Sequence, residues 1–465
     1  MICRSCSFKR INCISLIYLH YTRFIFEVQE VMEGEMDNLR EEAKSYRKSR
    51  EYNKAAEIYK NIIRDCEIEN LDKWLGWEYA DTLKRIGYLD DAIEVCKCIY
   101  KKDESFKFIK DLLAWCLYEK YFKNNNNINI IELEKIATFI TKIVEGDNDK
   151  TPYNKVVLRM INKFKKPFVY DKIIQWLEKA DLNYLSREPY RVSTKEDREV
   201  ELASNLEEWY YLYCKTLYYK KDYKKCLIYK EKAFKDINKF HNSYDIWLNR
   251  LEYLCYKNLG ELNKAIEGIE VLLNKRELWV CYYDLADVYM LLNENNKAIL
   301  YLSKALLSNG EDKSKIKAYE LMGRVLKNIG RYKEAEMHLL YGKEIRVKEN
   351  WKIPDNLKED LKEIDKSYKD KIISLNLKND LIDIWRKELL NDNRQYGEII
   401  TIGPNNRYGF IKGENENYYF RKSSIIDRRF IKQGMKVSYK LKKGFDVKKN
   451  TESVEAIEIL IMEDI

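Results

Sequence analysis

The chain has 465 residues, of which 45% are hydrophobic and 35% are charged. It therefore carries enough apolar material for folded cores, and its length suits about two to four domains. With 5 prolines and 16 glycines, chain breakers are scarce, which argues against a turn-rich all-β architecture and favours helices. The 85 Lys and Arg exceed the 76 Asp and Glu by only nine (85 − 76 = 9), so the total charge alone does not indicate a nucleic-acid-binding protein.

Residues 1–35 differ from the rest of the chain and are predicted to be a leader, either non-native or disordered, before a start at Met32 or Met36. An alternative interpretation is a zinc site, whose ligands would be Cys3, Cys6, Cys13 and His20. A strong zinc site needs paired ligand clusters at matched spacing, whereas this segment has a single CxxC. We therefore favour the leader and predict no metal.

The apolar run at 13–26 is the best candidate for a membrane span, but it is interrupted by His20 and Arg23. It is shorter than the ~20 apolar residues that a span requires, and it lacks the small-residue cleavage site of a signal peptide. The 11 cysteines are scattered, and five fall inside apolar helical patterns, namely Cys116, Cys214, Cys226, Cys255 and Cys281. Reduced, buried thiols of this kind indicate a cytoplasmic protein without a membrane partner.

From about Met36 the sequence repeats. Six stretches align on one small residue, which is Ala55, Ala92, Cys226, Ala265, Ala298 and Ala335. Twelve residues earlier the residue is mostly small, and the set is Ala43, Ala80, Cys214, Tyr253, Ala286 and Gly323. Nine residues earlier it is always large, and the set is Tyr46, Leu83, Leu217, Tyr256, Tyr289 and Leu326. Neighbouring anchors are 37, 39, 33 and 37 residues apart (92 − 55, 265 − 226, 298 − 265 and 335 − 298).

This pattern predicts two antiparallel helices per unit, with the small residues where the helices cross closely. It resembles the tetratricopeptide repeat (TPR), whose period is about 34 residues. We predict a mainly α fold in which a TPR-like solenoid has an N-terminal block at 36–185 and a C-terminal block at 186–347. The first block is expected to include one or two degenerate units after residue 106. A polar stretch at 181–211 is predicted to be a loop between the blocks, ending in a capping box formed by Ser204 and Glu207.

Stacked repeats of this kind curve into a groove that usually binds a peptide or protein. We expect the groove to be lined by the first helix of each pair. In the C-terminal block the lining residues would be Trp247, Arg250, Lys257, Tyr283, Asp287, Arg324 and Lys327. Each of these residues, taken singly, is also compatible with ordinary solvated helix surface. Residues 348–393 are predicted to form a capping helix and a linker.

The hydrophobic period changes after residue 393. Five short β-prone runs, "GEIITI", "RYGFIK", "YYFRK", "KVSYKLK" and "VEAIEIL", are separated by turn sequences within 394–465. Five strands in so short a segment suit a small closed barrel such as the OB-fold. If the barrel interior contains Ile411, Tyr418 and Phe420, strand alternation places Tyr408, Phe410, Tyr419 and Arg421 together on the outside.

Positive charge is concentrated in the same segment. Residues 407–449 contain 13 Lys and Arg against 4 Asp and Glu, a local excess of nine (13 − 4 = 9). Exposed rings beside cations suit single-stranded nucleic acid, because rings stack on any base and cations hold the backbone. The candidate nucleic-acid-binding residues are Arg407, Tyr408, Phe410, Lys412, Tyr419, Arg421 and Lys422.

The last 70 or so residues resemble a cold-shock domain. "GEIITIGPNNRYGFI" is similar to the family's first strand and "KGFGFI" motif, and "YYFRKSSI" is similar to its "VFVH" motif. The resemblance implies that Tyr408 and Phe410 match the two RNP1 aromatics, and that Tyr419 matches the RNP2 phenylalanine. Arg421 stands where the family has a stacking histidine. Thr401 and Lys422 replace two family aromatics, which implies weaker stacking and a larger contribution from charge.

No catalytic motif is present. The chain has 3 histidines (His20, His241 and His338) and lacks HExxH, P-loop and GxGxxG patterns. We therefore predict a non-enzymatic adaptor without cofactors, in which the solenoid binds a protein partner and the barrel binds single-stranded RNA or single-stranded DNA. Two alternatives are a protein scaffold whose barrel no longer binds nucleic acid and, less favoured, a hydrolase that uses unrecognised carboxylates.

Overall fold

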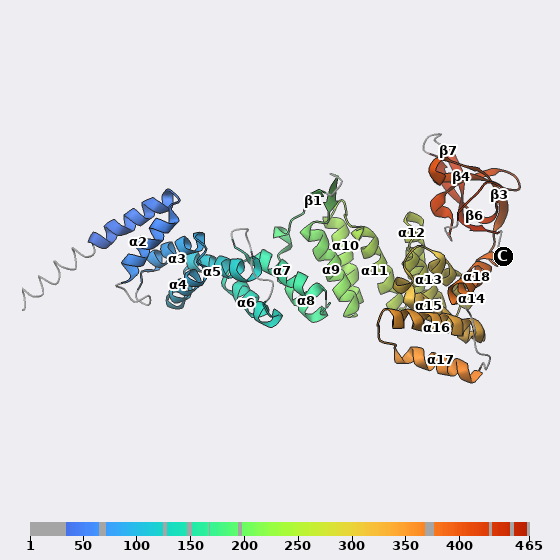
Figure 1. The fold of residues 1–465 in the computed structure, drawn as a ribbon, viewed down its shortest axis with the longest axis horizontal. Helices are drawn as coiled ribbons and strands as arrows, with labels where there is room; N and C mark the ends of the chain where they lie inside the picture. Colours follow the sequence, from blue (N-terminus) through green and yellow to red (C-terminus); the bar gives the residue numbers. More distant parts are fainter. Residues whose placement is uncertain are drawn as a thin grey trace, which may run out of the picture. The chain divides into compact units, whose positions relative to one another are not determined.

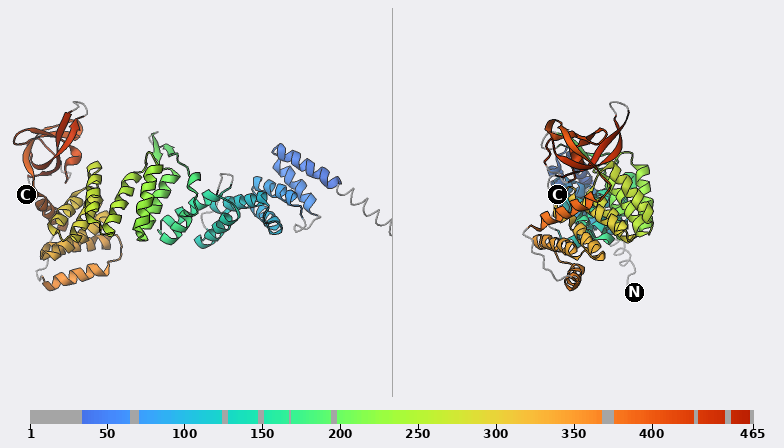
Figure 2. Two further views of the ribbon diagram at one scale, coloured as in Figure 1. Left: turned by 180° about the vertical axis from the view of Figure 1, so that it is seen from behind. Right: turned by 90° about the vertical axis from the view of Figure 1, so that its right-hand side faces the viewer.

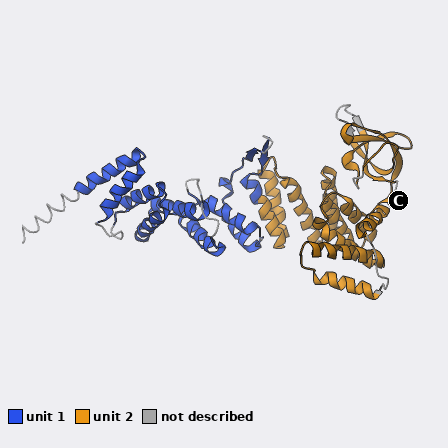
Figure 3. Cartoon of the chain, in the orientation of Figure 1, with its two compact units in different colours: residues 1–209 blue, residues 210–465 orange. Residues whose placement is uncertain are grey.

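A computed structural model describes residues 34–462 apart from 65–70, 124–127, 147–150, 167, 194–197, 368–375, 427–429 and 447–450. The ligands of the possible zinc site lie outside the described residues. The chain divides into two compact units, residues 1–209 and residues 210–465 (Figure 3).

The first unit consists mainly of helices that pack in antiparallel pairs (Figure 1). After a helical segment at residues 34–48, its helices are α2 (Tyr52–Arg64), α3 (Lys73–Arg85), α4 (Leu89–Lys102), α5 (Lys107–Tyr118), α6 (Ile130–Ile143), α7 (Tyr153–Lys165) and α8 (Tyr170–Leu177). A short π-helical turn, Glu119–Lys123, extends α5. The region after residue 106 therefore contains two further helix pairs, α5 with α6 and α7 with α8.

The segment at 181–211 was predicted to be a loop, but part of it forms strands. It forms an antiparallel hairpin of β1 (Tyr190–Ser193) and β2 (Glu199–Leu202), whose side chains are mostly exposed. Apolar and polar residues do alternate in both strands, YRVS and EVEL, but over only four residues each. Pro189 and the polar run around them favoured a loop instead. The predicted capping box is confirmed, because Ser204 N–H donates to Glu207 Oε1 at 3.0 Å and Glu207 N–H donates to Ser204 Oγ at 3.2 Å.

The second unit continues the helical repeat. Its paired helices are α9 (Asn205–Tyr219) with α10 (Tyr223–Asp236), α11 (Tyr244–Asn258) with α12 (Leu262–Lys275), α13 (Trp279–Leu291) with α14 (Asn295–Leu307), and α15 (Ile316–Asn328) with α16 (Tyr332–Lys348). The TPR-like solenoid followed by a barrel is therefore confirmed as the fold of the chain.

The small residues of the repeat lie where the sequence predicts them. All six anchors, Ala55, Ala92, Cys226, Ala265, Ala298 and Ala335, are fully buried. Tyr253 is the large exception among the residues twelve positions earlier. The facing helix compensates for it with Gly268, where a Cβ would lie 2.2 Å from the Tyr253 ring. In this unit the small residue lies on the second helix and not on the first, and the two helices still cross closely.

The turn inside each of these six helix pairs has one residue in the left-handed region. The six residues lie five positions before the anchors, and they are Arg50, Gly87, Lys221, Gly260, Asn293 and Gly330, with φ between 58° and 89°. This conformation is the usual way to end a helix, and glycine adopts it without strain. The shared backbone shows that units lacking the glycine still make the same turn.

Two helices follow the last pair. Helix α17 (Asp355–Ser367) packs against α16 and α15, whereas α18 (Leu377–Leu390) returns to pack against α14 and α16 (Figures 1 and 2). Lys378 of α18 lies over the rings of Tyr319, Tyr341 and Trp385 at 4.9 to 5.3 Å from their centroids. Its ammonium also donates to Asp312 at 2.7 Å. This contact fixes α18 on the solenoid, and with it the start of the barrel.

The barrel is closed by five strands, β3 (Gln395–Ile402), β4 (Tyr408–Lys412), β5 (Asn417–Arg421), β6 (Lys436–Asp446) and β7 (Thr451–Ile461). Their order around the barrel is β3-β4-β5-β7-β6, and β6 pairs back onto β3. The pairing of β5 with β7 is parallel, and the other pairings are antiparallel. Ile411 and Phe420 are fully buried in the core and Tyr418 packs against it, as alternation predicts.

Within the described residues, no helix has both the length and the apolar character needed to cross a membrane.

Candidate nucleic-acid interface

The rings of three residues meet on the outer face of β4 and β5. Phe410 is directly opposite Tyr419 in the strand register, and Tyr408 is opposite Arg421. The centroid of the Tyr419 ring lies 5.9 Å from that of Tyr408 and 5.8 Å from that of Phe410. Tyr408 and Phe410 remain 37% and 36% exposed. We call Tyr408, Phe410 and Tyr419 the aromatic triad.

Two glycines position the aromatic triad. Gly409 faces the barrel interior, where a Cβ would lie 2.5 Å from the ring of Phe420. The absence of that Cβ lets β4 run close over Phe420 while its flanking rings point outward. Gly403, just after β3, lies against the Tyr408 ring, and a Cβ there would come within 2.4 Å of it. The Tyr408 ring is therefore supported by backbone, which limits the freedom it loses on binding a ligand.

Four exposed cations lie next to the aromatic triad in the sequence or in the strand register. They are the predicted Arg407, Lys412, Arg421 and Lys422. Arg421 is 65% exposed and lies 3.6 Å from a carboxylate oxygen of Glu455 on β7. Lys412 is paired in register with Glu398 on β3. The two acidic neighbours reduce the local positive potential, so a bound phosphate backbone competes with them for Arg421 and Lys412.

The other cations of the basic segment do not all share this face. Lys440 forms an ion pair with Asp392, which lies just after α18. Lys442 Nζ donates to the carbonyl of Asn274 in α12 at 3.5 Å. These two residues attach β6 to the rest of the second unit, so part of the positive charge of this segment is used in holding the barrel and not at the candidate interface.

Thr401 marks the edge of the aromatic surface. It is the register partner of Phe410 on β3 and is exposed. Because a threonine offers no ring there, the stacking surface ends at Phe410.

The charged residues among the groove candidates of the solenoid all form ion pairs with neighbouring helices. Arg250 makes two hydrogen bonds to Asp284, at 2.6 and 2.9 Å, and Lys257 forms an ion pair with Asp287. In the next units Arg324 donates to Asp360 at 3.0 Å, and Lys327 donates to Asp360 at 2.6 Å and to Glu363 at 2.7 Å. Trp247 and Tyr283 are half-buried. We call these interhelical ion pairs the first-helix ladder.

The first unit has the same ladder at equivalent positions. Arg40 donates to Glu78 at 3.0 and 3.2 Å, and Arg47 donates to Asp81 at 2.7 Å. Arg40 and Arg250 both lie 15 residues before their anchors (55 − 40 and 265 − 250). The ladder is therefore part of how successive repeats bind each other, and its charges already have partners.

The first unit contains an aromatic cluster that was not predicted from the sequence, formed by Trp74, Trp77, Phe106 and Phe108. The ring centroids of Trp74 and Phe108 are 5.2 Å apart, and these two side chains are 42% and 52% exposed. A signal was present in the sequence, since Trp74 lies 18 residues before its anchor, as Trp247 does (92 − 74 and 265 − 247). Exposed large aromatics that touch one another are typical of contact surfaces.

The described residues contain no group of three or more His, Cys, Asp and Glu side chains that is arranged to hold a metal ion. His338 is a buried structural residue. Its Nε2 accepts a hydrogen bond from Trp385 Nε1 at 2.8 Å, and its Nδ1 lies 2.6 Å from the Glu334 carbonyl oxygen. Burial lowers the pKa of His338 to about 4, so it is neutral at physiological pH.

Residues 246–371, within the second unit, match the family model of a domain of unknown function (DUF7017). No curated protein is significantly similar to the chain in sequence.

Several solved structures of helical-repeat proteins are distantly similar to the chain. A tetratricopeptide repeat protein from Parabacteroides merdae is 13% identical with a TM-score of 0.30, and the match covers 71% of this chain and 98% of that chain. Human IFIT1, solved as a dimer with PPP-AAAA, is 17% identical with a TM-score of 0.36, covering 75% and 79% of the two chains. YrrB, a TPR protein with an unusual peptide-binding site, is 14% identical with a TM-score of 0.23, covering 54% and 92%.

Proposed function

We propose that the protein is a non-enzymatic adaptor whose barrel binds single-stranded RNA, or single-stranded DNA, while its solenoid binds a protein partner. The observation that carries the proposal is the aromatic triad, in which three rings meet on one exposed face beside four cations. Proteins that bind single strands without sequence preference use this combination of stacking rings and cations.

The topology supports an OB-type, cold-shock-like barrel. The strands close out of sequence order, with β5 beside β7, as in a Greek-key barrel. In OB-folds the face of the second and third strands binds oligonucleotides. The aromatic triad lies on β4 and β5, which are the second and third strands of this barrel.

The expected affinity is moderate and sensitive to salt. Each stacked base contributes about 1–3 kcal/mol, and three rings are available. The cations add an electrostatic contribution that weakens as the salt concentration rises. For a single strand, the slope of log K against log salt concentration is about −0.7 for each phosphate contacted. Because Glu455 and Glu398 lie beside Arg421 and Lys412, stacking supplies the larger share of this binding energy.

The protein partner is expected to contact exposed rings rather than the first-helix ladder. The charges of the ladder are already paired within the chain. The exposed rings of Trp74 and Phe108 are free of that constraint and provide apolar area, which is what interface hot spots use.

The proposal is tested by titrating a labelled, unstructured ten-nucleotide RNA with the full-length protein. The double variant Tyr408→Ala/Phe410→Ala should bind at least about tenfold more weakly, because two stacking surfaces are lost. The matched control is Tyr88→Ala, which removes a ring that is 59% exposed in the first unit, and its affinity should not change. Equal affinities of the wild type and the double variant would refute nucleic-acid binding by this face and would favour the protein-scaffold alternative.

A further inference from the structure

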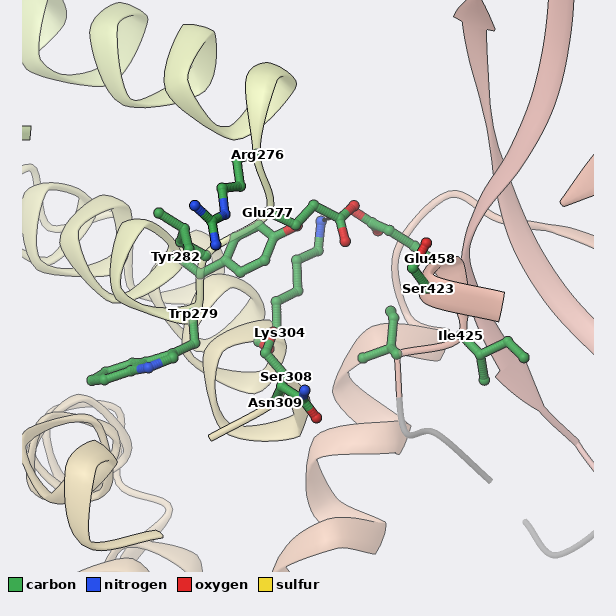
Figure 4. A pocket seen from close by; sticks show the side chains of 12 residues that line it. Arg276, Glu277, Trp279, Tyr282, Lys304, Ser308, Asn309, Ser423, Ile425 and Glu458 are labelled. Atoms are coloured by element: carbon green, nitrogen blue, oxygen red, sulfur yellow. Dashed lines mark hydrogen bonds and ion pairs between the residues drawn. The ribbon is translucent and has the colours of Figure 1, made fainter. Parts of the chain in front are cut away.

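A cavity of about 240 Å³ lies within the second unit, where the barrel meets the solenoid. Its solenoid side is formed by the loop between α12 and α13, by α13 and by the end of α14, and its barrel side by the turn after β5 and by β7. We call this cavity the junction pocket (Figure 4).

The wall of the junction pocket is held by a buried ion pair. Lys304 of α14 donates to Glu458 of β7 at 2.8 Å, and both side chains are nearly buried. Arg394, whose side chain is fully buried, donates to the Ser438 hydroxyl at 3.0 Å and also to the backbone carbonyl of Glu458. Breaking a buried ion pair leaves an uncompensated charge, so the Lys304–Glu458 pair links the barrel to α14 at the wall of the pocket.

The pocket lining contains both hydrogen-bond donors and acceptors. Its two cations already have partners, because Arg276 donates to Ser243 at 3.1 Å and Lys304 donates to Glu458 at 2.8 Å. Figure 4 shows Glu277 and Glu458 reaching toward the ammonium of Lys304. The pKa of Glu277 is raised, first by its partial removal from water and then by the nearby carboxylate of Glu458. The hydrogen bond of Lys304 goes to Glu458, so the carboxylate of Glu277 keeps the capacity to accept hydrogen bonds from a ligand.

The junction pocket adjoins the candidate nucleic-acid interface. Ser423, which lines the pocket, is two residues beyond Arg421, and Arg421 is the register partner of Tyr408. Two residues of extended chain span at most about 7 Å. A strand that stacks on the aromatic triad and continues past Arg421 and Lys422 therefore reaches the mouth of the pocket within one or two nucleotides.

Resting on the function proposed above, we infer that the junction pocket receives one base of the bound strand and selects bases with an exocyclic amino group. Carboxylates read the amino group of cytosine in this way, and a good contact of this kind discriminates by about 1–3 kcal/mol. Uracil has no exocyclic amino group, so Glu277 has less to accept from it. Tyr282, nearly buried at the pocket wall, supplies an aromatic surface beside the base. The solenoid thus contributes to base preference, while the aromatic triad contributes stacking to any base.

The test compares the affinities of the full-length protein for ten-nucleotide oligo(rC) and oligo(rU). The wild type should bind oligo(rC) about tenfold more tightly. The variant Glu277→Ala should lose this preference by weakening oligo(rC) binding, with oligo(rU) binding unchanged. The control Glu267→Ala, an exposed carboxylate on α12 away from the pocket lining, should keep the preference.

The outcomes separate the two proposals. If the wild type binds both oligomers equally, or if Glu277→Ala retains the preference, the base-selecting pocket is refuted while the stacking function stands. If neither oligomer binds, both proposals are refuted. If the preference disappears in Glu277→Ala but not in Glu267→Ala, the pocket is supported.

Discussion

Among single residues, Tyr419 holds the candidate interface together, because its ring contacts those of both Tyr408 and Phe410. Paired rings at such distances stabilise one another by about 0.5–1.5 kcal/mol. The aromatic triad therefore exists as a preformed surface before any ligand binds. Arg421 and Lys422 differ in kind, since they are exposed and contribute through charge that Glu455 partly offsets.

His338 determines part of the way in which the stability of the fold depends on pH. Its hydrogen bonds require a proton on Nδ1, which faces the Glu334 carbonyl, and a lone pair on Nε2, which faces the Trp385 N–H. Protonation of Nε2 would place its N–H group against the N–H group of Trp385, and the hydrogen bond between them would be lost. Burial is the main cause of the lowered pKa, and the nearby Arg331 and Lys378 charges lower it further.

We predict that stability falls as pH drops from about 6.5 toward 4. In that window the unfolded chain takes up a proton at His338 while the folded chain does not, so the free energy of unfolding decreases. From the lowered value of about 4, the loss between pH 7 and pH 5 is about 2 kcal/mol. Chemical denaturation at the two pH values measures it, and His338→Gln should reduce this difference by most of that amount. An unchanged pH dependence in the variant would contradict the assignment.

At the scale of helices, the first-helix ladder explains why successive repeats hold their register. Arg250 and Asp284 form its most buried rung, since the carboxylate is only 3% exposed. Removing one member of a buried pair leaves an uncompensated charge, which costs about 3–5 kcal/mol.

Arg250→Met is therefore expected to lower the free energy of unfolding by about 3 kcal/mol, as measured by denaturant titration. The double variant Arg250→Met/Asp284→Leu should recover much of this loss, because no buried charge remains. The control is Lys264→Met, which breaks a largely exposed ion pair with Glu261 on α12 and should change stability by less than about 1 kcal/mol. If Arg250→Met and Lys264→Met lowered the free energy of unfolding equally, the Arg250–Asp284 ion pair would not have the predicted role in stability.

The sequence predicts the helices and barrel strands well because both depend on local periodicity. The buried anchors from Ala55 to Ala335 repeat at fixed spacing, and the alternation around Ile411 and Phe420 identifies the inner face of the barrel. The β1–β2 hairpin was not predicted because its strands are only four residues long and lie beside Pro189 and a polar run, which favoured a loop.

Contacts between distant elements were not predictable in the same way. The ladder depends on which cation faces which acid across helices, as with Arg250 and Asp284, which are 34 residues apart. The junction pocket depends on the return of α18 over α14, which brings Lys304 to Glu458, 154 residues later. A single sequence shows no periodicity for such pairs.

At the scale of the whole molecule, the second unit combines two kinds of surface. The solenoid holds the barrel through Lys304, Lys442 and the residues around Asp392. The face formed by β4 and β5 carries the exposed aromatic triad. This division supports the proposal that one part selects a protein partner and the other binds a single strand.

Hydrogen–deuterium exchange of the full-length protein, with and without saturating single-stranded RNA, tests the proposed binding face most directly. We predict slower exchange in β4 (Tyr408–Lys412), in β5 (Asn417–Arg421) and in the turn after β5, with helices α15 and α16 unchanged. Protection confined to the helical repeats, or none in β4 and β5 when RNA is bound, would contradict the proposal that this face is the nucleic-acid interface.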